Sequence, residues 1–250
     1  MGQSTGIAWT RSTFNAWRGC SRVSEGCSRC YAEAMAKRNP AMLGRWGANG
    51  SRVIASESYW KQPLKWNKEA AATGEQWRVF AMSLGDVFED RPELIAPRIK
   101  LFRLIADTPA LTWLVLTKRP QNIAQLLPAN WGDGWPNVWL GTTIEDNRVV
   151  KRADFLRAIP AAVRFVSYEP AIGPLDELDL TGLHWLIVGG ESGSGFRPMD
   201  FQWARDLRAR CHGAGVAYFF KQSPGIRTGM GELLDGETIR EYPRTTVIGG

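Results

Sequence analysis

The stretch LTWLVLTKRP, residues 111–120, decides the fold class. From Leu111 to Leu116 it is almost continuously apolar. It lacks the alternation of apolar and polar residues that is typical of a strand with one solvent-exposed face. It then turns abruptly polar at Lys118 and Arg119. Such a run is typical of a strand that is covered on both faces, as in a parallel sheet. The stretch therefore predicts a buried parallel strand with polar side chains at its carboxyl end.

The same pattern recurs on both sides of this stretch. Alternating strands and helices indicate βα units around a parallel sheet. The last predicted helix contains Gly213, which is expected to stop it. The other predicted strands are WRVFAMSLGD (77–86), NVWLGTTIED (137–146), VRFVSYEP (163–170), LHWLIVGGESG (183–193) and VAYFFKQS (216–223). The predicted helices between them cover 92–107, 120–128, 147–160 and 200–215.

The number of these units indicates the architecture. Residues 12–19 predict a short first strand, and residues 30–38 predict the helix after it. The chain then has six or seven βα units, which favours an α/β fold with a partial TIM-like barrel. We expect this barrel to form one domain over residues 1–223. A doubly wound open sheet is the alternative.

Two segments depart from the pattern. Residues 39–76 are rich in Gly, Trp and Lys and have weak periodicity. We expect them to form an insertion after the first helix or an elaborated connection from that helix to the next strand. Residues 224–250 carry a turn signal at Asp235 and Gly236 and are expected to form a short C-terminal appendage.

Composition narrows the class of protein. The 250 residues carry a net charge of +6, which is compatible with a polyanionic partner such as nucleic acid. No run of eighteen apolar residues exists, so no membrane-spanning helix is expected. The first residues, MGQSTGIAWTRS, lack the apolar region of a secretory signal. We therefore expect a cytoplasmic protein that has no membrane partner.

Every predicted strand ends in polar side chains or glycine. In parallel α/β folds the active site lies at the carboxyl ends of the strands, because the loops converge there. A single polar strand end needs no such explanation, since it simply leaves the core, but six in succession favour a site. These ends hold Ser83, Gly85 and Asp86; Thr117, Lys118 and Arg119; Thr142, Thr143 and Glu145; Ser167 and Glu169; Gly189, Gly190, Glu191 and Ser192; Lys221 and Gln222.

Three of the four cysteines lie in WRGCSRVSEGCSRCYAE, residues 17–33, at spacing C-x6-C-x2-C. Clustered cysteines in a cytoplasmic protein are more often metal ligands or catalytic groups than disulfides. The polar residues between Cys20, Cys27 and Cys30 argue against buried, inert thiols. Two kinds of metal site remain.

A structural zinc site is the first alternative, and it needs four protein ligands. Cys27 and Cys30 supply one pair, so Cys20 and Cys211 would have to complete the set. Cys211 and His212 form a poor pair, because adjacent residues on a helix point about 100° apart. This alternative corresponds to a zinc-stabilised, basic nucleic-acid-binding module without catalysis.

A [4Fe–4S] cluster is the second alternative. Such clusters usually take four cysteines, so Cys20, Cys27 and Cys30 would leave one iron without a protein ligand. S-adenosylmethionine (SAM) binds such an iron, and its radical chemistry begins with electron transfer, which suits a chain with only 2 histidines. The set of three thiolates and the scarcity of histidine therefore favour an iron–sulfur enzyme that forms a 5′-deoxyadenosyl radical from SAM. A cluster used only for electron transfer is a further alternative.

Blocks in order along nearly the whole chain carry a resemblance. They are WTRSTFNAWRGC, GCSRCYAE, SLGDVFED, LTKRP, LGTTIED, SYEPAIGPLD, IVGGESGSGFRPM and FFKQ. With these blocks the sequence resembles the phage-associated gene-product-thirty-seven/sixty-eight family, which in turn is similar to radical SAM enzymes such as spore photoproduct lyase. This implies a radical-SAM-type partial TIM barrel with the cluster in the loop after the first strand. The loop departs from the usual C-x3-C-x2-C spacing by three additional residues between its first two cysteines.

The resemblance also implies roles for the strand ends. Cys20, Cys27 and Cys30 would hold the cluster, and Gly85 and Asp86 would meet the amino group of SAM. The glycines of IVGGESG would let the adenine approach the backbone closely. The other positions implied to contact SAM are Thr142, Glu145, Ser167 and Glu169 for the ribose and the methionyl carboxylate, and Gly189, Gly190 and Glu191 in the glycine block.

Cations at the same strand ends suggest a substrate. They would meet the phosphates of a nucleotide or nucleic acid, or they would pair with the neighbouring carboxylates. Tryptophans of the insertion would stack on bases or anchor the insertion to the barrel. The expected partners are such a substrate and an external electron donor such as a flavodoxin or ferredoxin. The cations are Lys118, Arg119, Arg197 and Lys221, and the tryptophans are Trp46, Trp60, Trp66 and Trp77.

Overall fold

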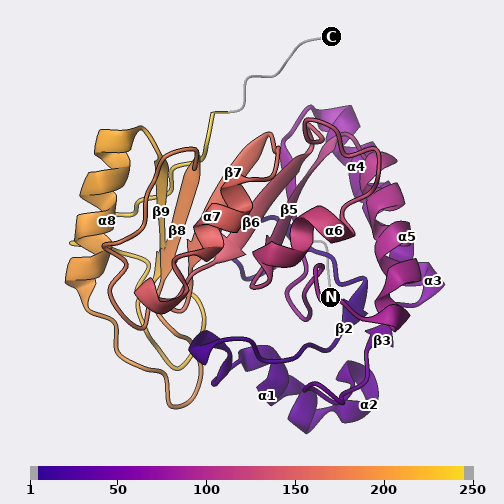
Figure 1. The fold of residues 1–250 in the computed structure, drawn as a ribbon, viewed down its shortest axis with the longest axis horizontal. Helices are drawn as coiled ribbons and strands as arrows, with labels where there is room; N and C mark the ends of the chain where they lie inside the picture. The colour runs from indigo at the N-terminus through magenta and orange to yellow at the C-terminus, as the bar shows by residue number, and fades with distance from the viewer. Residues whose placement is uncertain (1–4, 245–250) are drawn as a thin grey trace.

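The computed structural model describes residues 5–244 and has a seven-stranded parallel sheet at its centre. The sheet curls into a half-barrel (Figure 1). The strands lie side by side in the order in which they follow along the chain. This confirms the predicted α/β partial barrel and excludes the open-sheet alternative. The strands are β1 (Ser12–Thr13), β4 (Trp77–Ala81), β5 (Leu111–Thr117), β6 (Val138–Thr143), β7 (Val163–Tyr168), β8 (Trp185–Gly189) and β9 (Ala217–Gln222).

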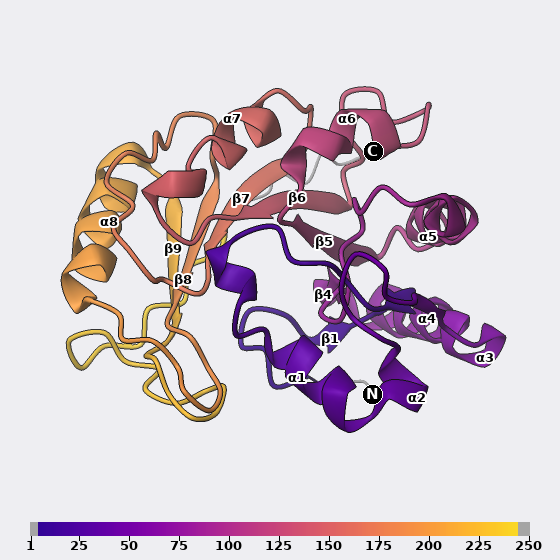
Figure 2. The ribbon, with the colours of Figure 1, turned by 60° about the horizontal axis from the view of Figure 1, so that its bottom comes forward.

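Helices cover the outer side of the sheet, and the concave side faces the N-terminal region (Figure 2). The outer helices are α4 (Gln62–Thr73), α5 (Ile95–Ala106), α6 (Ile123–Leu126), α7 (Arg152–Arg157) and α8 (Phe201–Ala214). The N-terminal region holds α1 (Tyr31–Arg38), α2 (Pro40–Leu43), α3 (Glu57–Trp60) and the pair β2 (Trp17–Arg18) and β3 (Val53–Ile54). Short 3-10 turns are η1 (Glu25–Cys27), η2 (Pro92–Leu94), η3 (Pro120–Asn122) and η4 (Asn147–Val149).

The two faces of each strand pack into different cores. On β5, Trp113 and Val115 belong to the outer core beneath the helices, whereas Leu114 belongs to the inner core. The inner core is mainly aromatic and is centred on the fully buried Trp185, which contacts the rings of Trp9, Trp139, Phe165 and Phe219. These side chains fill the amino end of the half-barrel, and so they leave its carboxyl end for a cavity.

The end of α8 differs from the expectation. Gly213 does not stop the helix, which continues to Ala214. Gly215 is the terminating residue, with φ of 67°, and its backbone N–H bonds back to the last turn. A C-terminal cap of this kind requires the left-handed conformation, which glycine adopts at little cost. At the other end, Asp200 accepts a hydrogen bond from the backbone N–H of Gln202.

Residues 39–76 form a more regular connection than their weak periodicity suggested. The segment contains α2, β3, α3 and α4, and α4 leads directly into β4. Trp60 and Trp66 are buried in the outer core, so these two tryptophans anchor the segment to the barrel. The ring of Trp66 stacks on that of Trp77, the first residue of β4. The segment is thus an elaborated crossover between the first helix and β4. The predicted strand 12–19 is divided between β1 in the barrel and β2, which pairs with β3.

The C-terminal tail lies along the last strand. Asp235 and Gly236 both have positive φ and form the predicted turn. Beyond it, the N–H of Phe220 donates to the carbonyl of Ile239, and the indole of Trp185 donates to the carbonyl of Glu241. The tail therefore closes the free edge of β9 as far as the described residues extend. Within 5–244, no helix has the length and apolar character needed to cross a membrane.

Candidate functional site

A cavity of about 720 Å³ opens at the carboxyl ends of the strands. The cysteine loop, residues 20–30, forms one wall of this cavity, and loops after β8 and β9 contribute Ser192, Gly193 and Arg227. Trp9 and Phe80 contribute an apolar part of the lining. Strand ends that were predicted from sequence supply the polar lining, namely Asp86, Lys118, Arg119, Ser167, Glu169 and Lys221.

The face of the strand decides which predicted residues reach the cavity. Thr143 lines it, whereas Thr142 is fully buried on the other face of β6 and donates to the carbonyl of Thr117 at 3.0 Å. Thr143 pairs in register with Ser167, which also lines the cavity. Successive residues of a strand point to opposite faces, so Thr142 and Thr143 cannot share a site.

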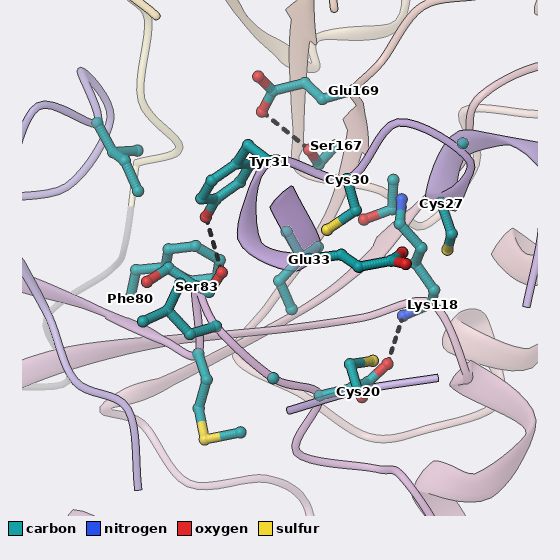
Figure 3. A pocket seen from close by; sticks show the side chains of 18 of the residues that line it. Cys20, Cys27, Cys30, Tyr31, Glu33, Phe80, Ser83, Lys118, Ser167 and Glu169 are labelled. Atoms are coloured by element: carbon teal, nitrogen blue, oxygen red, sulfur yellow. Dashed lines mark hydrogen bonds between the residues drawn. The ribbon is translucent and has the colours of Figure 1, made fainter. Parts of the chain in front are cut away.

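All three cysteines of the loop line the cavity (Figure 3). Cys27 is buried, and Cys20 and Cys30 are half-buried. Burial raises the pKa of the Cys20 thiol to about 12, and the nearby carboxylate of Asp86 acts in the same direction. Burial also raises the pKa of Cys30. Without a metal, these two thiols are therefore protonated at neutral pH.

Arg119 fastens the first half of the loop. Its Nη1 donates to Sγ of Cys20 at 3.6 Å and to Oδ2 of Asp86 at 2.8 Å. Its Nη2 donates to the carbonyl and to the hydroxyl of Ser21, at 2.8 and 2.9 Å. The Ser21 hydroxyl in turn donates to Glu89 at 2.7 Å. One guanidinium thus joins the loop to the segment that follows β4.

Glu145 fastens the second half of the loop. It is almost completely buried and accepts from Ser24 at 2.9 Å, from Lys118 at 2.7 Å and from Arg152 at 2.9 Å. Burial opposes its ionisation, but the charges of Lys118 and Arg152 prevail and hold the pKa of Glu145 below its usual value. The carboxylate lies beneath the loop and is not among the residues that line the cavity.

Gly85 and Asp86, at the end of β4, were predicted to contact a ligand, and in the structure both contact other parts of the protein. Gly85 lies against Trp17 and Met82, where a Cβ would approach the methyl carbon of Met82 within 2.7 Å. Asp86 is 4% exposed and is fully hydrogen-bonded by the protein: Oδ1 accepts from Thr117 at 2.6 Å, and Oδ2 accepts from the backbone of Lys118 at 3.1 Å as well as from Arg119. Its carboxylate therefore organises the loop.

Glu169 and Lys221 face each other at the end of the half-barrel opposite β4. Nζ of Lys221 lies 2.6 Å from Oε1 of Glu169, and Ser167 donates to Oε2 at 3.0 Å. Both charged groups are partly exposed to the cavity. Their charges and the Ser167 hydroxyl make this a polar part of the lining, at the ends of β7 and β9.

The glycine block lies beside this pair. Gly189 lies against Glu169, where a Cβ would come within 2.7 Å of Oε1, and Gly190 lies against Pro224. Neither lines the cavity. Glu191 is buried, also outside the lining, and binds Arg197 through both carboxylate oxygens. The space beside both glycines, where adenine was expected to approach the backbone, is thus taken by protein atoms of Glu169 and Pro224.

All four predicted cations form ion pairs. Lys118 pairs with Glu145, Arg119 with Asp86, Arg197 with Glu191 and Glu25, and Lys221 with Glu169. Arg197 does not line the cavity. Each of the four cations therefore pairs with a neighbouring carboxylate, as the second alternative predicted.

The three cysteines supply donors of the kind that an iron–sulfur centre needs, but their arrangement is open. Three soft sulfur donors line one cavity, and one of them already accepts a charge-assisted hydrogen bond, as cluster sulfurs do. They suit an iron–sulfur cluster in kind. Within the described residues, however, no three Cys, His, Asp or Glu side chains are gathered as a metal-binding group. Cys211, needed for the zinc alternative, is fully buried in the outer core on the inner side of α8, and it does not line the cavity.

Four further residues belong to the site, of which the sequence had indicated Tyr31 and Trp46 but not the buried pair of Arg52 and Glu89. Tyr31 lines the cavity and donates to the carbonyl of Ser83 at 2.7 Å. Arg52 and Glu89 form a buried, two-bond ion pair at 2.6 Å beneath the cysteine loop. Trp46 also lines the cavity, unlike the other tryptophans of its segment. The position of Tyr31 next to Cys30 indicates from the sequence that its ring could shield a bound cluster from water, whereas no local signal indicates the pair of Arg52 and Glu89.

Comparison with known proteins identifies the family. A family model with the description "Protein of unknown function (DUF5131)" matches residues 4–243. The chain therefore belongs to that family. No curated protein and no solved structure matches the chain.

Proposed function

We propose that this family member is a cytoplasmic iron–sulfur enzyme of the radical SAM type. In this proposal Cys20, Cys27 and Cys30 hold a [4Fe–4S] cluster. The observation that carries it is that all three cysteines line one cavity at the carboxyl ends of a curled parallel half-barrel. In such folds the reacting groups gather at this edge. Three thiolates are also one fewer than a cluster usually takes, which leaves a position for SAM.

When bound, the cluster would supply one electron to the sulfonium of SAM, so that the S–C5′ bond breaks into methionine and a 5′-deoxyadenosyl radical. The residues of the chain would bind and orient SAM and exclude water. The cavity volume is within the range of small-molecule sites. Ser167, Glu169 and Lys221 offer hydrogen bonds to the polar groups of SAM, and Trp9 and Phe80 offer an apolar wall.

The loop would change when the metal binds. Cluster ligands are deprotonated, so binding must release the protons that burial favours on Cys20 and Cys30. The sulfurs would also have to lie closer together than in this structure, where no three such side chains of the described residues are gathered as a metal-binding group. Arg119 and Glu145 would keep the two halves of the loop attached to the barrel while this happens.

The charges at the cavity mouth suggest an anionic substrate, such as a nucleotide or nucleic acid. Arg227 lines the cavity and has no ion-pair partner within the part of the chain that the structure describes. Unpaired arginines suit phosphates, which they bind through two parallel hydrogen bonds. An external electron donor such as a flavodoxin or ferredoxin would reduce the cluster.

Anaerobic reconstitution with iron and sulfide tests the proposal. We expect about four iron atoms per chain and a brown protein that dithionite bleaches. Cys20→Ala, Cys27→Ala and Cys30→Ala should each lose most of this iron. Cys211→Ala is the matched control and should keep it. A colourless wild-type protein that instead binds zinc stoichiometrically would contradict the proposal and favour the non-catalytic module.

A further inference from the structure

Positive charge is concentrated in a segment that borders the cavity. Residues 22–45 contain five exposed Lys or Arg and two Glu, a net charge of +3, which is half of the net charge of +6 of the whole chain. Arg22 lines the cavity, and both Arg22 and Lys37 bind Glu33. The segment therefore carries an excess of positive charge that its own carboxylates do not balance, which favours a polyanionic partner.

Arg38 and Arg45 belong to this excess. Arg38 lies three positions after Met35 on α1, and residues at this spacing are neighbours on the helix surface. Arg45 directly precedes Trp46. Met35 and Trp46 both line the cavity. The two arginines are exposed and form no ion pair within residues 5–244, so they are available to a ligand that extends out of the cavity.

A third cation, Arg227, comes from a different part of the chain, the loop 223–231 after β9. A buried side chain holds this loop in place: Oε1 of Gln222 accepts from the hydroxyl of Thr228 at 2.9 Å and from the backbone N–H of Gly229 at 2.8 Å. Arg227 and Thr228 both line the cavity. A fixed loop thus presents an exposed cation at the opening.

Exposed apolar side chains lie beside these cations. Val23, Met35 and Ile226 line the cavity and are exposed. Tyr31 also lines it and is 47% exposed, and the hydrogen bond of its hydroxyl to the carbonyl of Ser83 holds the ring at the cavity (Figure 3). Surfaces for single-stranded nucleic acid combine the same two kinds of group, because bases stack on aromatic rings while cations contact the phosphates.

We propose that the mouth of the cavity binds a single strand of nucleic acid, with one base on the ring of Tyr31 and phosphates on Arg38, Arg45 and Arg227. The inference rests on the proposed function, because it names the class of the anionic substrate suggested there, but it needs no metal.

The geometry favours a single strand over a free nucleotide or a duplex. Arg38 and Arg45 lie outside the lining and Arg227 lies within it, so the cations extend over more than one phosphate. A cavity of about 720 Å³ accommodates one small molecule. A base reaches such a cavity only when it is unpaired and unstacked, which costs least in a single strand.

Charge variants test the phosphate contacts. Arg227→Gln, and Arg38→Gln combined with Arg45→Gln, remove exposed cations that form no ion pair within the described residues, so neither protein should lose its fold. Lys65→Gln combined with Lys68→Gln is the matched control for charge, because both lysines are exposed on α4, at the outer side of the sheet.

Two substitutions of Tyr31 test the base contact. Tyr31→Leu and Tyr31→Phe both lose the hydrogen bond to the carbonyl of Ser83, and only phenylalanine keeps an aromatic ring. A difference in affinity between these two variants therefore reports stacking and not the loss of the hydroxyl.

Fluorescence anisotropy with the metal-free full chain measures the binding of labelled DNA and RNA strands of about twelve nucleotides. We expect a single strand to bind about tenfold more tightly than the matching duplex. Each arginine variant should bind the strand about three- to tenfold more weakly, with a flatter dependence on salt, and the lysine control should stay within about twofold. Tyr31→Leu should lose about tenfold and Tyr31→Phe less than about twofold.

The outcomes separate the inference from the proposed function. Failure of the wild-type protein to bind either strand, equal affinity for strand and duplex, or equal losses in the arginine variants and the lysine control would overturn the inference, even if the reconstituted protein cleaves SAM. Equal losses in the two Tyr31 variants would overturn the base contact. Strand binding by a protein that forms no cluster would support the inference and contradict only the enzyme. A preference for the DNA or the RNA strand supports the inference and identifies the sugar.

Discussion

Gly26 lies directly against the carboxylate of Glu145, so closely that a Cβ on Gly26 would come within 2.3 Å of Cγ of Glu145. The cysteine loop therefore passes over a buried carboxylate that three other groups also contact. Only glycine fits at this crossing. The loop and the barrel are thus packed together at the position before Cys27.

Gly26→Ala should displace the loop from the barrel. The added methyl overpacks a closed contact, which costs about 1–3 kcal/mol of unfolding free energy. We also expect reconstituted iron to fall several-fold, because Cys27 follows directly. Chemical denaturation and iron analysis measure the two effects. Gly213→Ala is the control, since nothing lies within 4 Å of its added carbon and its φ is not positive. Equal losses of unfolding free energy and of iron in the two variants would contradict the contact between Gly26 and Glu145.

Glu145→Gln should change the pH dependence of stability. The lowered pKa of Glu145 means that its contribution is present above its unfolded pKa of about 4.3 and is lost as the pH falls through the folded value. At pH 7 we expect the substitution to cost about 3 kcal/mol, because two cations lose their buried partner. Between about pH 5 and 3, the variant should lose less unfolding free energy than the wild type does.

Denaturant titrations at several pH values make this measurement. Glu57→Gln provides the control, because Glu57 is exposed and pairs only with the exposed Lys100. Its effect should stay within roughly 0.5 kcal/mol. If the unfolding free energies of the wild type and the Glu145→Gln variant changed equally with pH, the neighbours of Glu145 would not lower its pKa, and the prediction would be wrong.

Lys221→Met should weaken SAM binding. If Glu169 and Lys221 bind the polar end of SAM, losing one charged donor should reduce affinity roughly ten- to hundredfold, as expected for about 1.5–3 kcal/mol. Equilibrium dialysis with labelled SAM measures this on the reconstituted protein. Lys151→Met is the control, because Lys151 is exposed beside α7 on the outer side. Unchanged affinity in Lys221→Met would place SAM elsewhere in the cavity.

Trp185→Ala should destabilise the whole barrel. Trp185 is fully buried at the centre of the inner aromatic core, and its indole holds the C-terminal tail at Glu241. We expect a loss of about 3–5 kcal/mol, the range for removing a large aromatic side chain from a core. Trp185→Phe should lose less. A small effect of the alanine variant in chemical denaturation would contradict the central packing role.

The sequence predicted the barrel well because its strands are buried on both faces. Continuous apolar runs such as 111–116 and 185–188 leave little ambiguity about the strand. The same burial hides which face is inner. Thr142 was therefore expected at the site, although Thr143 has the inward position.

The packing between distant segments was not predictable. Gly190 suggested room for a base, but Pro224 fills that space, and only the fold brings the two together. The pairs of Lys118 with Glu145 and of Arg119 with Cys20 join residues about 30 and 100 positions apart, a separation that no local pattern encodes. The cysteine loop itself was located correctly, since its motif is contiguous.

EPR spectroscopy of the reduced, reconstituted protein, recorded with and without SAM, tests the central claim most directly. If Cys20, Cys27 and Cys30 hold a cluster with one iron available to SAM, the signal of the reduced cluster should change when SAM is added. The Cys211→Ala protein should show the same change. A reduced cluster whose spectrum is identical with and without saturating SAM, or a protein that forms no cluster at all, would contradict the claim.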